Sequence, residues 1–66
     1  MTNQEIYLAR AAEARSDAGE ATLANVRERA LRSEAAWADM AARAGRTDTM
    51  RARLAAEKAS RESRSD

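Results

Sequence analysis

The chain has 66 residues, of which 35% are charged, a formal net charge of +1, and no cysteine, histidine or proline. This composition excludes disulfides and the ordinary zinc and haem sites, and the length allows one domain at most. With 12 basic and 11 acidic residues, the chain has no bulk electrostatic attraction to nucleic acid or to an acidic membrane surface.

The first predicted helix spans residues 3–18. Thr2-Asn3-Gln4-Glu5 is a capping box, in which the Thr2 hydroxyl accepts from the Glu5 amide and the Glu5 carboxylate returns to Thr2. An apolar stripe follows at steps of four and three, and it consists of Tyr7, Ala11, Ala14 and Ala18. Gly19 suits the end of this helix with a positive φ. The apolar phase continues through Ala21, so a continuous helix is the alternative.

The second predicted helix spans residues 22–44, with Thr22 as its N-cap and Gly45 at its end. Its stripe also follows steps of three and four, with Ser33 in one slot, and it consists of Leu23, Val26, Ala30, Trp37, Met40 and Ala44. Because the connection is short, we expect the two helices to form an antiparallel hairpin with Tyr7 opposite Trp37 to Met40.

Arg46-Thr47-Asp48-Thr49 interrupts the pattern, and Thr47 is a fair N-cap for a third helix over residues 48–59. Met50 and Leu54 are the only sizeable apolar residues of that helix. Residues 60–66 contain no apolar residue and are typical of a disordered tail. The predicted fold is therefore all-α: an antiparallel two-helix hairpin, a shorter third helix and a disordered C-terminal tail, with residues 1–59 as a single helical domain.

Residues 6–44 resemble a class of short, uncharacterised bacterial helical-hairpin proteins. The resemblance rests on Tyr7-x3-Ala11, on Val26-Arg27-Glu28-x2-Leu31 and on Trp37-x2-Met40-Ala41-x-Arg43-Ala44. It implies a fold and no activity.

Catalysis is not expected, because acid–base and nucleophilic sites use histidine, cysteine or a buried carboxylate. Glu13 and Asp17 are an i,i+4 carboxylate pair, but without a second acidic helix they indicate a solvated face rather than a metal site. We expect no cofactor. The sequence also shows no membrane span and no signal peptide, so we expect a cytoplasmic protein.

The sequence favours a non-enzymatic interaction module. The core is poor, because 18 alanines accompany only four leucines, three methionines and one tryptophan, and alanine contributes little buried area. Trp37 has two interpretations that are compatible with each other. It stacks on Tyr7 or Leu8 within the chain, and it anchors an interface, since Trp and Tyr are enriched at hot spots. The predicted interface residues are Tyr7, Val26, Leu31, Trp37 and Met40. They would bury their surface in a homodimeric four-helix bundle or against a helix of another protein.

The alternative is weak nucleic-acid binding through arginines, which pair well with phosphates. The candidate residues are Arg27, Arg32, Arg43, Arg46, Arg51 and Arg53. Acidic residues lie among them and the total charge is near zero, so a helix surface bearing salt bridges is the favoured interpretation of these residues.

Overall fold

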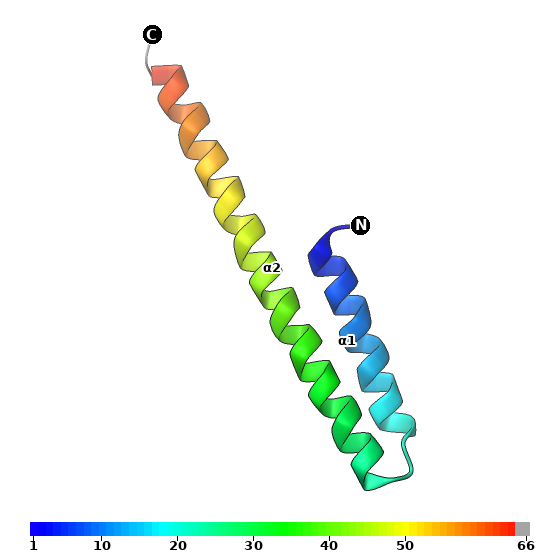
Figure 1. Ribbon diagram of the computed structural model, residues 1–66. Helices are drawn as coiled ribbons and strands as arrows, with labels where there is room; N and C mark the ends of the chain where they lie inside the picture. Colours follow the sequence, from blue (N-terminus) through cyan, green and yellow to red (C-terminus); the bar gives the residue numbers. More distant parts are fainter. Residues whose placement is uncertain (65–66) are drawn as a thin grey trace.

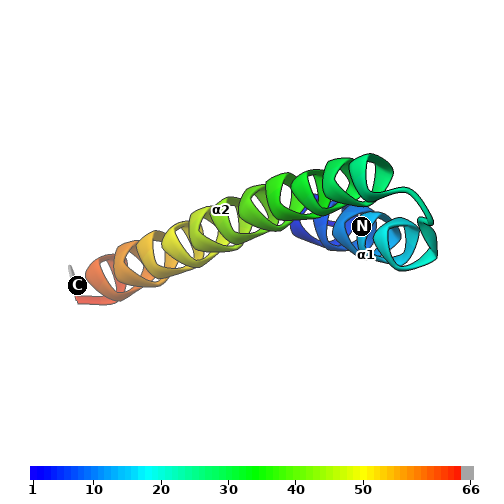
Figure 2. The same cartoon turned by 90° about the horizontal axis from the view of Figure 1, so that it is seen from below.

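The computed structural model of the chain describes residues 1–64, which contain two α-helices and no strand. Helix α1 covers Asn3–Glu20 and helix α2 covers Ala24–Arg64, with lengths of 18 and 41 residues. The two helices run antiparallel and side by side, and α2 extends far beyond the N-terminal end of α1 (Figures 1 and 2). The molecule measures 66 × 17 × 10 Å. The chain is therefore all-α, as the composition predicted, but strongly elongated.

The start of α1 follows from its capping residue. The Glu5 amide donates to the Thr2 hydroxyl oxygen at 3.2 Å, and Thr2 itself is extended, with a φ of −81° and a ψ of 161°. The predicted capping role of Thr2 is therefore confirmed. At the other end, the helix continues through Gly19 to Glu20, and Ala21 turns the chain in an extended conformation. The prediction that Gly19 has a positive φ is wrong, since no residue from 1 to 64 has one.

The turn between the helices is fastened by Arg27. Its guanidinium Nη2 donates to the carbonyl oxygen of Ala21 at 2.9 Å, so a side chain from the first turn of α2 satisfies a carbonyl left free at the end of α1. Helix α2 begins at Ala24 rather than directly after Thr22, and the Arg27 amide donates to the Leu23 carbonyl at 3.0 Å.

The predicted third helix and disordered tail are wrong, because α2 continues without a break through Gly45 to Arg64. The stretch that suggested a new N-cap is helical, and the Thr49 hydroxyl donates to the Gly45 carbonyl at 2.9 Å. That bond satisfies the hydroxyl inside a helix, and without a proline nothing in the stretch removes a backbone donor. Helix also covers residues 60–64 of the predicted tail, while 65 and 66 lie outside the described residues.

The contact between the helices is made by small residues. Ala14, Ala18 and Ala41 are the buried residues within 1–64, and Ala41 is only 2% exposed. The residues of intermediate burial that surround them are Gln4, Tyr7 and Ala11 on α1, Ala21 in the turn, and Ala30, Ser33, Glu34, Trp37, Ala44 and Gly45 on α2. Such a contact brings the backbones close but removes little apolar area from water.

Gly45 has a packing role instead of the helix-ending role that the sequence suggested. A β-carbon at this position would lie 2.5 Å from Nε2 of Gln4, which is closer than two such atoms approach. The missing side chain therefore leaves room for the end of the Gln4 side chain against the middle of α2.

Candidate interaction surface

The largest side chains of the helix contact are Tyr7 and Trp37. Their rings stack with centroids 6.0 Å apart and planes inclined at 29°, within the range of favourable aromatic pairs. Of the two intramolecular partners predicted for Trp37, Tyr7 is the one that stacks on it. Both rings stay partly exposed, because two helices alone cannot enclose them.

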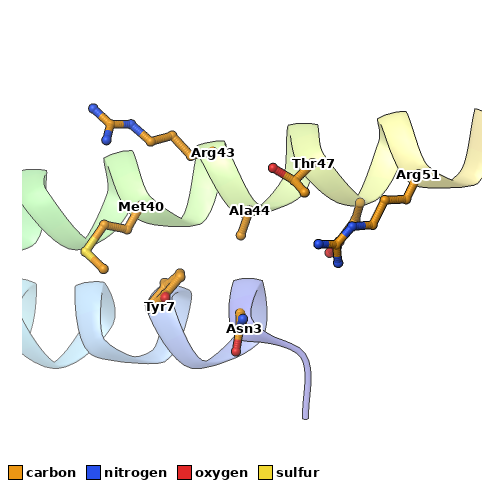
Figure 3. Close-up of a pocket in the computed structure, with 8 residues that line it drawn as sticks. Asn3, Tyr7, Met40, Arg43, Ala44, Thr47 and Arg51 are labelled. Carbon is orange, nitrogen blue, oxygen red and sulfur yellow. The ribbon is translucent and has the colours of Figure 1, made fainter.

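Met40 extends the apolar surface beside this aromatic pair. It lines the same open hollow as Tyr7 and Ala44, with a volume of about 360 Å³. In Figure 3 the side chains of Tyr7 and Met40 each reach toward the opposite helix, whereas Arg43 points away from α1. Met40 remains 37% exposed, while its neighbour Ala41 takes the buried position against α1. The stripe that faces α1 thus passes through Ala41, and Met40 lies at its edge.

A polar rim borders Trp37 farther along the helix pair. Arg10, Glu13, Asp17 and Ser33 line a second hollow with Trp37, with a volume of about 310 Å³. Arg10 and Glu13 form an ion pair at 3.1 Å across one turn of α1. The apolar centre formed by Tyr7, Trp37 and Met40, which we name the aromatic patch, thus has charged groups beside it.

The other two predicted interface residues are not in the aromatic patch. Leu31 is nine residues before Met40, which places it about 180° around α2 from Met40. Leu31 is 46% exposed. Val26 is also exposed and lies two heptads before Met40, on the same side of α2 but near the turn. The structure therefore groups Tyr7, Trp37 and Met40, and it separates Leu31 from them.

Four of the six candidate arginines share one face of α2, and the other two lie apart from it and from each other. Arg32, Arg43, Arg46 and Arg53 lie within about 80° of one another around α2, on the side opposite Trp37. Arg43 forms an ion pair with Asp39, one turn earlier on α2, at 2.9 Å. Arg53 Nη2 lies 3.3 Å from the sulfur of Met50. The Arg27 side chain is hydrogen-bonded to the turn between the helices. Arg51 lines the hollow beside Tyr7.

Met50 and Leu54 form a second apolar site, which the sequence pattern placed in a separate third helix. They are 45% and 53% exposed, and every residue from 46 to 64 is exposed. Being four residues apart in one continuous helix, they lie on one face, within about 40° of each other. Their i,i+4 spacing in the sequence was the signal that identifies this pair as one surface.

The elongated shape leaves much more surface in contact with water than a compact chain would. The radius of gyration is 18.4 Å, against about 11 Å for a compact domain of this length. The accessible area is 5385 Å², whereas a compact folded monomer of 7.2 kDa exposes about 4,100 Å². The excess of about 1,300 Å² exceeds the ~800 Å² that each partner contributes to a standard protein interface.

Within residues 1–64 no three acidic side chains gather closely enough to hold a metal ion together. Neither helix, over the same residues, has a stretch long and apolar enough to span a bilayer. Comparison with protein-family models, with curated proteins and with solved structures gave no match for this chain. The resemblance to short bacterial helical proteins therefore stays a prediction.

Proposed function

We propose that this protein is a non-enzymatic contact module that buries the aromatic patch against a helix, either of a second copy or of another protein. The cytoplasm is the compartment we expect for it. The observation that carries the proposal is the lack of a closed core: three alanines are the buried residues among 1–64. A chain of this length needs more buried apolar area than alanines supply to offset the entropy of ordering about 60 residues.

The aromatic patch is suited to this role by its composition. Tyrosine and tryptophan are rigid and amphipathic, so they contribute a large contact area at a small entropic cost. Met40 adds an adaptable apolar side chain at the open edge of the patch. The charged groups beside Trp37, including the Arg10–Glu13 pair, would then orient the incoming helix at the rim.

The experiment is sedimentation equilibrium from low micromolar to millimolar concentration, with helicity measured by circular dichroism over the same range. Self-association through the patch predicts a dimer and a helicity that rises with concentration. Docking of another protein predicts a monomer with low helicity. A fully helical monomer at every concentration would contradict both forms of the proposal.

Two single substitutions locate the surface. Met40→Ala removes apolar area from the aromatic patch without touching the Tyr7–Trp37 stack, and it should weaken association. Leu31→Ala is the matched control, because Leu31 is similarly exposed on the same helix but lies on another face. Equal effects of the two substitutions would show that the aromatic patch is not the contact surface.

Nucleic-acid binding is the second candidate, favoured by the shared outward face of Arg32, Arg43, Arg46 and Arg53. The Asp39–Arg43 ion pair lowers the net charge of that face. Retention on DNA or RNA at low salt, with a steep loss as salt is added, would support this candidate. No retention at low salt would remove it.

A further inference from the structure

We infer that the aromatic patch is covered by residues 46–64 of a second copy of this chain, which lie along the groove between α1 and α2. We call these residues the α2 tail. The α2 helices of the two copies run antiparallel, and a two-fold axis passes between Gly45 and Arg46. The inference rests on the proposed role as a contact module, and it names both the partner and the segment that docks.

The groove that receives the tail runs along one side of the helix pair. The two hollows described above share that side, because their lining residues on α2 include a series at alternating steps of four and three. This series consists of Ser33, Trp37, Met40, Ala44, Thr47 and Arg51. Trp37 is only half-buried and Met40 is exposed, so the groove presents apolar area that α1 does not cover.

The same series continues beyond α1 into the tail. After Thr47 and Arg51, the next positions at steps of three and four are Leu54 and Lys58. A repeat with these alternating steps forms the seam of a left-handed coiled coil. Because α2 is one unbroken helix, its hairpin part and its tail present this seam on one side.

The seam is complementary to itself when two copies run antiparallel about this axis. Trp37 then lies opposite Leu54 of the second copy, and the two-fold symmetry repeats this contact on the other side of the axis. The exposed Leu54 side chain thus covers the ring that α1 leaves open. The remaining layers pair Ser33 with Lys58, Met40 with Arg51 and Ala44 with Thr47, one residue of each pair coming from each copy.

Net charge favours the tail as the occupant of the groove. Residues 1–45 carry six basic and seven acidic side chains, whereas residues 46–64 carry six basic and three acidic side chains. The tail is therefore attracted to the hairpin of a second copy and is repelled by the tail of that copy. The proposed register places each tail beside the partner's hairpin, and the two tails extend away from each other from the axis.

A local charge contact supports the same register. The hollow that contains Ser33 and Trp37 is also lined by Glu13 and Asp17. Lys58 of the second copy, opposite Ser33, falls beside these two carboxylates. Glu13 is paired with Arg10, whereas Asp17 forms no ion pair within residues 1–64. Asp17 is therefore the carboxylate that Lys58 of the second copy would pair with.

The other cations of the seam do not face one another. The Arg51 stem packs on Met40 of the second copy while its guanidinium group reaches solvent. Arg29 and Arg64 of the second copy share an edge at the outer end of the seam. Both are exposed, and Arg64 is hydrogen-bonded to the Ser60 carbonyl at 3.4 Å, so solvent screening limits their repulsion.

The lengths of the elements also match. The part of α2 beyond α1 (Figure 1) is residues 46–64, which equal the 18-residue helix α1 in length to within one residue. The axis between Gly45 and Arg46 lies close to the middle of α2. Each tail therefore covers the groove of its partner from end to end.

A charge exchange in the full chain, followed by sedimentation equilibrium, tests the position of Lys58. Lys58→Glu puts a third carboxylate beside Glu13 and Asp17, and we expect the dimer dissociation constant to rise at least tenfold. Adding Asp17→Lys should restore most of the loss, because the pair is re-formed with reversed polarity. Failure of the double variant to recover would overturn the register.

Arg53→Glu is the matched control for Lys58→Glu. It makes the same change in charge on the same helix, and each residue precedes a glutamate by four positions. Arg53 lies about 140° around α2 from Lys58, so its substitution should change the dissociation constant by less than about twofold. Equal effects of the two substitutions would show that only the net charge of the tail matters and would overturn the inference.

The apolar layer is tested in the same way. Leu54→Ala removes the side chain that covers Trp37 and should weaken the dimer about as much as Met40→Ala does. Leu31→Ala is the control, since Leu31 is similarly exposed on the same helix but lies outside the seam. Equal effects of Leu54→Ala and Leu31→Ala would overturn the contact between Leu54 and Trp37.

A spin label at Ser60→Cys measures the arrangement directly, because the chain has no other cysteine. In the proposed dimer the two labelled positions are about 44 Å apart along the helix axes, and electron–electron double resonance measures this distance. A distance below about 25 Å would indicate parallel helices or paired tails and would overturn the inference.

The proposed function and this inference fail in different ways. If Met40→Ala weakens the dimer while Lys58→Glu and Leu54→Ala behave like their controls, another surface covers the patch. That result overturns this inference alone. A monomer with low helicity also overturns it and leaves docking of another protein. A fully helical monomer at millimolar concentration overturns both.

Discussion

Tyr7 and Trp37 stack across the two helices with their ring centroids 6.0 Å apart. One ring comes from the second turn of α1 and the other from the middle of α2, so this contact sets the register of the helix pair. The remainder of the contact surface is mostly alanine, which fits many registers equally well. The aromatic pair is therefore the most specific contact that the chain makes with itself.

A double-mutant cycle on this pair should show a direct energetic coupling. Tyr7→Leu and Trp37→Leu each keep an apolar side chain but remove a ring. We expect a coupling of about 0.5–1.5 kcal/mol in the free energy of unfolding, measured by urea titration at fixed protein concentration. The control cycle pairs Tyr7→Leu with Leu31→Ala and should give a coupling near zero. Equal couplings in the two cycles would mean that the stack is not an independent contact.

The sequence predicted the parts of the fold that depend on local signals. The Thr2 cap and the small-residue stripe of α1 follow from residue type and spacing alone, and the structure contains both. The stacking of Trp37 on Tyr7 also follows from spacing once a short turn makes the helices antiparallel. Phase alone did not separate Met40 from Ala41, since both lie near the same stripe. Which of these two residues is buried depends on how α1 is rotated about its axis against α2.

The wrong predictions arose at residues with two structural uses. Glycine ends helices, but it also occurs within them, and Gly45 lies inside α2 beside the end of the Gln4 side chain. Threonine caps helices, but Thr49 bonds back to the Gly45 carbonyl from inside one. Local sequence cannot distinguish these uses, because the difference lies in what the opposite helix presents.

Alanine substitutions at the two glycines should differ in effect. Gly19 is helical and a β-carbon there meets no atom within 4 Å, so Gly19→Ala should stabilise the chain by about 0.8–1 kcal/mol. Gly45→Ala should gain less, because its β-carbon would displace the end of the Gln4 side chain. Thermal and urea unfolding followed by circular dichroism measure both. Adding Gln4→Ala should bring the Gly45→Ala gain up to that at Gly19. A large loss that Gln4→Ala does not relieve would mean that the backbone of α1 fills the space beside Gly45.

The hydrogen bond from Arg27 to the Ala21 carbonyl should contribute modestly to the helix pair. Arg27→Met keeps most of the apolar stem and removes the donor, so we expect a loss of about 0.5–1.5 kcal/mol in the free energy of unfolding. Arg29→Met, in the same part of α2, controls for the change in charge. If both variants lost the same stability, general electrostatics rather than this bond would account for the effect.

The continuity of α2 through residues 45–49 can be tested with a single proline. A new helix starting after Thr47 would place Asp48 at its first position, where proline is favoured, so Asp48→Pro would cost little. In the continuous helix of the structure, the same proline removes a hydrogen bond and clashes with the preceding turn, at a cost of about 3 kcal/mol or more. We therefore expect Asp48→Pro to lower helicity and to reduce the radius of gyration measured by X-ray scattering, because the tail no longer extends along the axis of α2. Asp48→Ala, which removes the carboxylate but keeps the helix, should preserve both. A proline variant with unchanged helicity and dimensions would show that the helix is already interrupted there, and that the residues after Asp48 do not continue along the axis of α2.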